Sequence, residues 1–486
     1  MSTANILEII PGPAARFGRF IEMAKIFSDP IQYFDKHFKE YGRIFGALTS
    51  SLTTPPSPNY PGTICIYGPE LIRELCSDHD NFHRSALSHR LYPADKVTPR
   101  TEPLKHIMTG LTHVRGDTHR AHRRLILPAF HKQRVKTYLP EIISEIQNLI
   151  EEWQVGEVYD MSREMSKLIL RISARSLFGQ TDQAEGRRIS LLIDHWVDFI
   201  MSVSHLFPLD FPGTPYHKWL NLSHEIETTT RRIITEKRAN GANDVSLLSM
   251  LIQATDEGGT GFSEDDLIGH ISLMLWGSRD AAAAALMWTI FLISLHAEVQ
   301  ENVIDELDSI LDGSPPSIEQ LTQLPMTENA LKESLRLLPP FPLVNRVASP
   351  RGQLGGFEVP GGTEVIMSIY HTHRMPELYS EPATFRPNRW QTIKPETFEF
   401  MPFGGGPRMC PGSNLAWQEL MVALAMLLQR FRFEMVDRAK VDRVVKLGLM
   451  PKRGLPMKVH LQDREFSKSV KPVGGNLNEM VATLPQ

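Results

Sequence analysis

The sequence has few cysteines, no excess of charge of either sign and no Pro/Gly/Ser-rich linker. Its 486 residues include only three cysteines, Cys65, Cys76 and Cys410, which are too few for a disulfide framework and are not spaced as zinc ligands. A reduced environment fits this cysteine content. The net charge is −4, from 52 basic and 56 acidic side chains, and this balance argues against a nucleic-acid role for the protein as a whole.

The N-terminus lacks the layout of a signal peptide, and only one stretch could be misread as a membrane span. This stretch, residues 267–295, contains His270, Arg279 and Asp280, and charges at the centre of a span are costly. We therefore expect it to be a buried helix of a protein without a membrane span.

Helical spacing of apolar residues dominates the chain. It is found in residues 115–150, with a break near Pro128, and in residues 161–178, 185–237, 327–338 and 411–431. Ser263 and Asp266 form a capping-box pattern that opens a long helix over about 264–297, and Ser317 and Gln320 open a short one in the same way.

Strand signals are confined to short stretches between glycine and proline turns. They cover residues 60–68, 341–370 and a final hairpin within 443–461 around residues 451–454, while residues 376–409 read as loop. The chain is predicted to fold as one mainly α domain with a minor β portion over residues 1–463. Residues 464–486 are expected to form a polar, mobile C-terminal tail.

Residues 403–412, FGGGPRMCPG, combine three consecutive glycines with a cysteine at the start of a helical stretch. The glycines allow backbone conformations closed to other residues, and they let a large planar ligand approach closely. Pro411 suits the first turn of a helix, so Cys410 lies at or just before a helix N-terminus. Backbone N–H groups and the helix dipole there favour the thiolate, which is the form that binds metal.

The same stretch matches the pattern F-x-x-G-x-x-x-C-x-G in full, through Phe403, Gly406, Cys410 and Gly412. It resembles the heme-binding loop of the cytochrome P-450 family, and the resemblance covers most of the chain. The resemblance implies the single-domain cytochrome P-450 fold and heme b with the Cys410 thiolate as axial ligand, which favours O–O cleavage. It also places Phe403, Gly404 and Gly412 beside the heme. A buried structural cysteine, the alternative, does not account for the complete motif.

Glu333 and Arg336 lie three residues apart on one predicted helix and therefore share a face. Such pairs are common, but this one precedes Pro339 and Pro340 and, further on, the cysteine loop. The resemblance implies that Arg389 joins them in a buried network that braces the heme loop. The alternative is a solvated surface trio. Buried charges persist only when paired, so loss of one member should destabilise the protein strongly.

Heme carries two propionates, which need cationic or hydrogen-bond-donating partners. The resemblance supplies four candidates: His119 and Arg123 stand one helical turn apart, Arg346 lies in a strand after residue 340, and Arg408 lies two residues before the cysteine. Each alone reads equally well as a solvated surface group, and their matching contexts favour propionate binding. His119 stands where many relatives carry Trp, which changes the donor but not the role.

The stretch GSRDAAAAALMW resembles the family's distal-helix motif, [A/G]-G-x-[D/E]-T. Aligned on the acid, Gly277 matches, Ser278 replaces glycine, Asp280 is the acid and Ala281 stands where threonine is usual. A register one residue earlier would put Arg279 at the acid position, and we prefer the first register because the later residues of the motif fit it.

The missing hydroxyl matters because dioxygen activation needs two protons, which the threonine and the acid normally help to deliver. Asp280, Ala281 and Ser278 are therefore the candidate catalytic positions. Three explanations for Ala281 remain open. A hydroxyl group of the substrate takes the place of the threonine, or Ser278 does so together with a water molecule. In the third, the enzyme does not activate dioxygen and instead uses peroxide or rearranges a substrate. An ordinary alanine in an alanine-rich helix is the plain alternative. Our hypothesis is substrate-assisted proton delivery.

By the resemblance, a substrate pocket lies above the heme and is lined by residues 80–112, 195–215, 276–281, 343–344 and 447–449. The individual candidates are Trp276, Gly277, Leu343, Val344 and Leu449, and three aromatic residues, Phe199, Phe207 and Phe211, that are more simply explained as core. The lining is mainly apolar, so a hydrophobic small molecule is expected. Fatty-acid, terpenoid and polyketide-like substrates remain open.

A group of basic residues near the expected proximal heme face would attract an acidic electron donor. It consists of Arg120, Arg123, Arg124, Lys132, Arg134 and Lys136, for which a solvated face is an equally good explanation. No flavin, iron–sulfur or nicotinamide domain is recognisable. The resemblance therefore implies a separate ferredoxin or flavodoxin with an NAD(P)H reductase. We also expect a cytoplasmic monomer that binds no nucleic acid.

The leading prediction is a heme-thiolate monooxygenase that inserts one oxygen atom from O2 into a hydrophobic small molecule. The second is a heme-thiolate enzyme that needs no reductase, such as a peroxygenase, isomerase or dehydratase. The third is a non-catalytic heme-binding or gas-sensing protein, whose motif around Cys410 would look the same.

Overall fold

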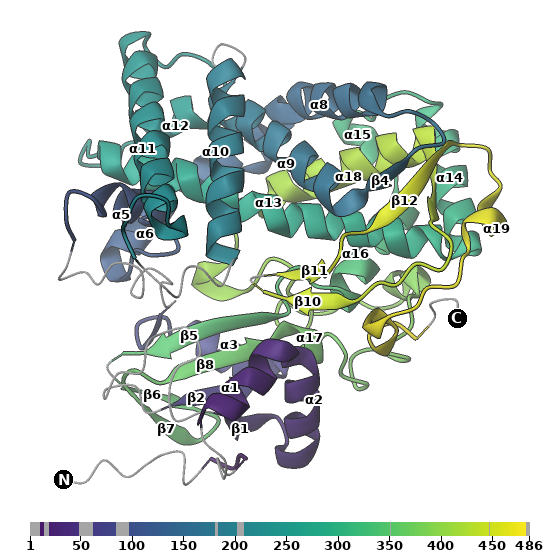
Figure 1. The fold of residues 1–486 in the computed structure, drawn as a ribbon, viewed down its shortest axis with the longest axis horizontal. Coiled ribbons are helices and arrows are strands. Elements are labelled where there is room, and N and C mark those ends of the chain that lie inside the picture. Colours follow the sequence, from purple (N-terminus) through teal and green to yellow (C-terminus); the bar gives the residue numbers. More distant parts are fainter. Residues whose placement is uncertain are drawn as a thin grey trace.

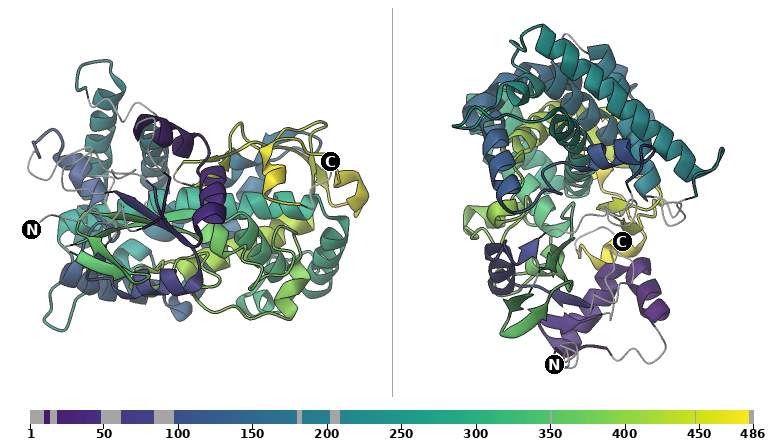
Figure 2. Two further views of the ribbon diagram at one scale, coloured as in Figure 1. Left: turned by 90° about the horizontal axis from the view of Figure 1, so that it is seen from below. Right: turned by 90° about the vertical axis from the view of Figure 1, so that its left-hand side faces the viewer.

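The computed structural model describes residues 10–13, 19–47, 62–83, 97–179, 183–201, 209–349, 351–446 and 448–482. Helices make up most of it, and a smaller β-rich part lies to one side of them (Figures 1 and 2). The prediction of a mainly α fold with a minor β portion is confirmed.

The helical part runs from the early segments of the chain to its last described residues. Its longer helices are α1 (Arg19–Ser28), α2 (Pro30–Tyr41), α3 (Pro69–Ser77), α5 (Glu102–Met108), α6 (Gly116–Ile126), α8 (Leu139–Glu152), α9 (Met161–Phe178), α10 (Gln183–Met201), α11 (Pro215–Ala239), α12 (Leu247–Gln253), α13 (Glu264–Ser294), α14 (Ala297–Leu311), α16 (Pro325–Leu337) and α18 (Ser413–Arg430). Single turns connect them: η3 (Leu127–Phe130), α7 (Lys132–Val135), η4 (Lys136–Tyr138), α15 (Ile318–Leu321), α17 (Ile369–Thr372), η6 (Pro387–Gln391), η7 (Gly406–Arg408), α19 (Phe466–Ser469) and η8 (Asn476–Glu479).

The largest sheet brings together segments that are far apart in the sequence. Its strand order is β1-β2-β8-β5-β3, from β1 (Ile44–Gly46), β2 (Thr63–Ile66), β3 (Phe82–His83), β5 (Leu343–Ala348) and β8 (Glu364–Ser368). β2 runs parallel to β8 with Thr63 opposite Glu364, and a hairpin of β6 (Arg351–Leu354) and β7 (Phe357–Pro360) follows β5. α2 packs on this sheet through Phe34 and Phe45, so the N-terminal helices belong to the β-rich part.

α13 is the central helix of the molecule. Its N-terminus has the predicted capping box: the Asp266 N–H donates to Ser263 Oγ at 3.1 Å, and the Ser263 N–H donates to Asp266 Oδ2 at 3.2 Å. Residues 282–294 are all buried, as expected for a helix that is apolar on every side. α9, α5, α16 and α18 pack around it, so α13 joins the layers that surround the cysteine loop.

Within the described residues, no single helix is long and apolar enough to cross a bilayer. α13 and α14 reach that length and apolarity only as a pair, and the chain bends by 111° between them.

Two expectations about chain continuity need correction. The helical stretch 185–237 is two helices, α10 and α11, separated by residues 202–214. The hairpin expected around residues 451–454 is wrong in its pairing, because β10 (Arg443–Val445) pairs with β11 (Leu449–Pro451). The following strand, β12 (Pro456–Leu461), pairs instead with β9 (Phe431–Met435) and with β4 (Val158–Asp160). These partners are distant in sequence, which local turn signals cannot reveal.

The expected mobility of the C-terminal tail is also wrong for residues 465–482. Val473, Leu477, Met480 and Val481 are each at most 1% exposed, so the segment is packed against the rest of the protein. The prediction failed because the segment is polar on average, although these four apolar residues form a buried face. The division of the chain at residue 463 stays a prediction.

Replacement of Ser263 by Ala tests the capping box of α13. The free energy of unfolding should fall by about 1 kcal/mol, because the hydrogen bonds of the Ser263 hydroxyl with the Asp266 N–H and with the Asp266 carboxylate are lost. The midpoint of urea denaturation measures this. Ser309→Ala is the matched control, since Ser309 is exposed near the end of α14 and bonds only to the Glu306 carbonyl of its own helix. Equal midpoints for the two variants would contradict the role of the cap.

Candidate functional site

Cys410 lies in a closed loop immediately before α18. Its N–H donates to the Phe403 carbonyl at 3.0 Å, which joins the two ends of the loop, and its side chain is exposed. α18 begins at Ser413, with Gly412 as its N-cap residue. A Cβ on Gly412 would lie 3.9 Å from Cys410 Sγ, so the helix N-terminus is next to the sulfur. This position favours the thiolate through the helix dipole.

Two glycines of this loop are required by its backbone. Gly404 has a φ of +75° and Gly406 a φ of +68°, a region that other residues rarely adopt. A Cβ on Gly406 would also approach the Cys76 carbonyl of α3 to 3.1 Å. The loop therefore packs directly on the β-rich part. The sequence analysis did not predict this contact with Cys76.

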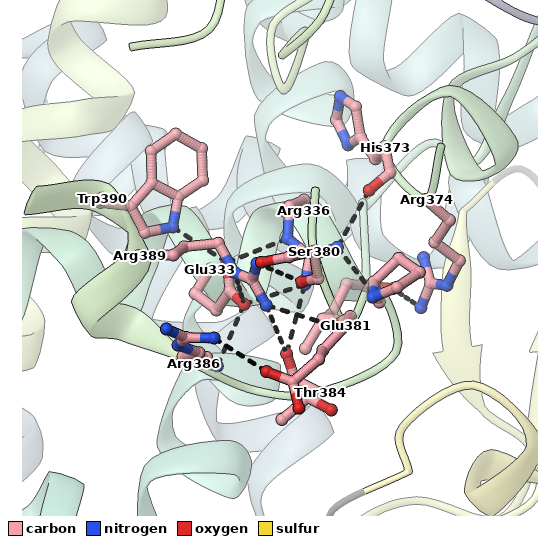
Figure 3. A network of polar contacts seen from close by, with 12 residues as sticks. Glu333, Arg336, His373, Arg374, Ser380, Glu381, Thr384, Arg386, Arg389 and Trp390 are labelled. Atoms are coloured by element: carbon pink, nitrogen blue, oxygen red, sulfur yellow. Dashed lines mark hydrogen bonds and ion pairs between the residues drawn. The ribbon is translucent and has the colours of Figure 1, made fainter. Parts of the chain in front are cut away.

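The structure brings Glu333, Arg336 and Arg389 together in a buried network (Figure 3). The Glu333 carboxylate is 2.8 Å from Arg336 Nη2 and 2.9 Å from Arg389 Nε, and all three side chains are at most 3% exposed. The Trp390 indole N–H also donates to Glu333, at 2.9 Å. Sequence reasoning missed Trp390, although it directly follows Arg389.

The network connects to the cysteine loop through backbone contacts. The Met401 N–H donates to His373 Nε2 at 2.9 Å, and the Tyr379 hydroxyl donates to the Glu399 carbonyl at 3.0 Å. The His373 carbonyl in turn accepts a hydrogen bond from the Arg336 guanidinium, at 2.9 Å. Because residues 399–401 lead directly into Phe403, the network fixes the start of the loop.

Three of the four propionate candidates surround the cysteine. Arg123 donates to the Met409 carbonyl at 2.8 Å, and Arg408 donates to the carbonyls of Leu111 and Val114 at 3.2 and 3.0 Å. His119 is 4% exposed, and burial, followed by the charges of Arg408 and Arg123, lowers its pKa to about 4. His119 is therefore a neutral donor, while the two arginines carry the charge.

Arg346, the fourth candidate, provides a test of whether a heme fits here. It is 6% exposed on β5, donates to the Asn345 carbonyl at 2.8 Å and contacts the Cys76 thiol. Burial lowers its pKa, and within the described ranges no carboxylate forms an ion pair with it. A buried guanidinium without an acidic partner is unfavourable, and a propionate would supply the missing charge. The residues present therefore fit heme.

The distal-helix residues lie on different sides of α13. Arg279 forms ion pairs with Asp194 and Asp198 of α10, at 2.5 and 3.3 Å, and with Asp280 at 3.0 Å. Burial raises the pKa of Asp280, which the Arg279 charge opposes and the two α10 carboxylates reinforce. Asp280 is thus a partly buried acid that holds its proton more tightly than an exposed one.

Ser278 faces α9 in the structure. Its hydroxyl is 2.9 Å from the Ser173 hydroxyl of α9 and donates to the Leu275 carbonyl at 3.1 Å. Both interactions keep the Ser278 hydroxyl inside the α9–α13 interface. Ala281 is partly buried and offers no polar group of its own.

The expected pocket residues are divided among several cores. Trp276 packs against the large helical core, Leu343 and Val344 pack against the cores of the β-rich part, and Gly277 lies beside Leu273. Leu449 is fully buried, and its carbonyl accepts the Trp288 indole N–H at 3.0 Å. Residues 84–96, Phe207 and residue 447 lie outside the described residues.

The two described aromatic candidates, Phe199 and Phe211, lie in different surroundings. Phe199 stacks on Trp219 with ring centroids 4.7 Å apart, so it belongs to the α10–α11 core. Phe211 is 64% exposed, which excludes it from an enclosed pocket. These aromatic residues owe their positions to helix packing and to a surface loop.

The basic residues form a partly compensated surface on α6, α7 and η4. Arg124, Lys132 and Lys136 are exposed, whereas Arg120 is paired with Asp117 at 2.6 Å and with Asp80 at 3.3 Å. Arg123 binds the cysteine loop, and Arg134 is half-buried. The exposed positive charge is therefore smaller than the sequence suggested.

The family model "Cytochrome P450" matches residues 10–458. The chain is 29% identical to "Cyclooctat-9-en-7-ol 5-monooxygenase" of Streptomyces melanosporofaciens, over 76% of this chain and 79% of that protein. It is 28% identical to "Pentalenene oxygenase" of Streptomyces avermitilis, over 70% and 77%. The solved structure "Retinoic acid bound cyanobacterial CYP120A1" has a TM-score of 0.77 at 23% identity and covers 93% of this chain and 99% of that one.

Replacement of Glu333 by Gln tests the buried network. The free energy of unfolding should fall by about 3–5 kcal/mol, because two buried guanidinium groups lose their counter-charge. Thermal denaturation measures this loss. Glu328→Gln on the same helix is the control: its partner Lys332 is partly exposed, so the change should stay within about 0.5 kcal/mol. A stability of Glu333→Gln equal to that of the control would show that the network is not required.

Proposed function

Because the chain belongs to the cytochrome P450 family of heme-thiolate monooxygenases, we propose that it inserts one oxygen atom from O2 into a hydrophobic small molecule, with Cys410 as the iron ligand. The observation that supports this assignment best is the closed 403–410 loop, which puts the Cys410 sulfur at the N-terminus of α18. Family members bind heme b through a cysteine thiolate, and Cys410 is the cysteine of the matching motif.

In this proposal, bound heme supplies the redox chemistry that activates dioxygen, and the protein holds the heme and controls protons. Arg123, Arg346 and Arg408 neutralise the propionates, and His119 donates a hydrogen bond to one of them. Phe403, Gly404 and Gly412 shape the loop beside the ring. The buried position of Arg346 supports this assignment, because no carboxylate in the described ranges pairs with it, and His119 is buried beside the charges of Arg408 and Arg123.

Proton delivery is the step at which this chain differs from its family. Asp280 is the proposed proton-relay acid, and its raised pKa favours proton retention until it is needed. Ser278 is a poorer substitute for the missing threonine than a substrate hydroxyl, because its own hydroxyl is engaged with Ser173. We therefore assign the missing hydroxyl at Ala281 to the substrate.

A terpenoid is the proposed substrate class, ahead of fatty acids and polyketide-like molecules. The relatives support it by name: one acts on cyclooctat-9-en-7-ol and another is a pentalenene oxygenase. The first name is that of an alcohol, which agrees with a substrate that brings its own hydroxyl group.

Electrons are proposed to come from a ferredoxin or flavodoxin type donor with an NAD(P)H reductase. Exposed Arg124, Lys132 and Lys136, on the side of the cysteine loop, support an acidic partner. The monomeric state and the cytoplasmic location stay predictions.

A second candidate function is a heme-thiolate enzyme without a redox partner, such as a peroxygenase, isomerase or dehydratase. The observation that favours it is Ala281, since such reactions do not need the same delivery of two protons. Turnover with peroxide alone, compared with turnover with a surrogate reductase, separates the two functions.

Replacement of Cys410 by Ser tests the ligand assignment. The reduced carbon-monoxide spectrum of the wild type should show a thiolate-type band, and Cys410→Ser should lose it together with monooxygenase activity. Cys65→Ala is the control, because Cys65 is buried in the small core beside α2, and it should keep the band. A thiolate-type band in Cys410→Ser, or a histidine-type band in the wild type, would overturn the assignment.

Replacement of Ala281 by Thr tests substrate-assisted proton delivery. Terpene alcohols and the corresponding hydrocarbons are first screened by the spin shift of the ferric protein. The measured quantity is the ratio of product formed to NAD(P)H consumed. With a bound alcohol, Ala281→Thr should change this ratio far less than the roughly hundredfold effect expected of a general acid–base group. With the hydrocarbon, Thr should improve this ratio. Ala281→Val, which matches Thr in shape without the hydroxyl, is the control. A large gain for Thr over Val with the alcohol would contradict the hypothesis.

A further inference from the structure

The segment of residues 465–482, here called the C-terminal strap, lies beyond residue 458, the last residue that the family model matches. It runs from α19 back towards β10 and α17 (Figure 1). On this path it contacts several elements that are far apart in the sequence, and two of its contacts are with the loop that holds the buried network.

Residues 380–384 form a loop in which every backbone carbonyl has a donor. The network arginines supply four of them: Arg389 donates to residues 380 and 381 at 2.6 and 3.2 Å, Arg336 to residue 382 at 2.7 Å, and both to residue 384 at 3.3 and 3.4 Å. The remaining carbonyl, that of Ala383, accepts the Ala482 N–H at 2.9 Å. The strap therefore supplies the donor for the one carbonyl of this loop that the two arginines do not bind.

Arg374 is the second point of contact. It is partly buried, and its guanidinium donates to the Leu337 carbonyl at 2.6 Å and to the Met480 carbonyl at 3.0 Å. It also stacks on the Tyr370 ring at 3.8 Å, and burial lowers its pKa to about 10. In the described part of the chain no carboxylate pairs with it, so each carbonyl acceptor helps to compensate this partly buried charge.

The strap is itself anchored on both sides of these contacts. The Val441 N–H donates to the Gly474 carbonyl at 2.8 Å, and Leu477 is fully buried in the main core. Arg443 forms ion pairs with Glu479 of the strap at 3.0 Å and with Asp29, before α2, at 2.8 Å. Met480 and Ala482 are therefore held in place by contacts other than those they make to the network.

We propose that the strap is a positioning segment of the heme site, which holds residues 374–384 through Met480 and Ala482 and so sets the position of the Cys410 loop. The route is continuous: residues 373 and 379, beside these contacts, bond to residues 401 and 399, which lead into the loop. The proposal rests on the proposed role of Cys410 as heme ligand. Its consequence is that a loosened strap lets the loop move and the heme escape.

Replacement of Ala482 by Pro removes the N–H that binds the Ala383 carbonyl, and Ala482→Ser keeps it. Ala482 is exposed, so neither new side chain enters the core. Both holoproteins are mixed with excess apo-globin, and heme transfer is followed by absorbance. The Pro variant should release heme about five to ten times faster, as expected for loss of one hydrogen bond. It should also show a larger fraction of reduced protein without the thiolate-type carbon-monoxide band.

A second pair of variants decides the matter if Ala482→Pro does not fold. Leu477→Ala weakens the anchor of the strap, whereas Leu461→Ala removes a half-exposed side chain of β12 just before the strap. Leu477→Ala should release heme faster than Leu461→Ala. Equal rates within each pair would overturn the role of the strap. Absence of the thiolate-type band from the wild type would instead overturn the Cys410 assignment, so the two failures are distinguishable.

Discussion

The Glu333 carboxylate is the interaction on which the site depends. It has two positively charged neighbours, Arg336 and Arg389, and no exposure to water, so one negative charge is shared by two buried guanidinium groups. The remaining positive charge has to be balanced by oriented carbonyl groups, and the 380–384 loop supplies them. The shape of that loop is thus a consequence of electrostatics: its backbone carbonyls surround the two cations and, together with the His373 carbonyl, accept their hydrogen bonds.

This arrangement explains which parts of the site were predictable from the sequence. The Cys410 loop and the Glu333–Arg336 pair are each formed by residues close together in the sequence. The glycines of the loop and the helical spacing of the pair are enough to predict their local geometry. The capping box of α13 is of the same kind. The contacts of Cys76 and Trp390, and the packing of residues 465–482, depend on segments that meet only in the folded chain. The pairing of β12 with β9 and β4 was missed for the same reason.

The distal helix shows how a local substitution acquires meaning from its surroundings. Ala281 alone is an ordinary helical residue, but in the structure the Ser278 hydroxyl is engaged with α9 and the Arg279 charge with α10. These two side chains therefore hold helices together and do not replace the missing hydroxyl. The same ion pairs tie α10 to the acid Asp280, so the packing of this helix and the environment of the acid are not independent.

The strap also has a consequence for the order of events during protein synthesis. Ala482 is translated after every other member of the Glu333 network, yet its N–H supplies the contact to the Ala383 carbonyl. Domains begin to fold while the chain is still growing, but here the ribosomal tunnel must release residue 482 before the cysteine loop is fully held. If the strap holds the heme site as proposed, stable heme capture has to wait for residue 482, and a nascent chain stalled before that residue would hold its cofactor loosely.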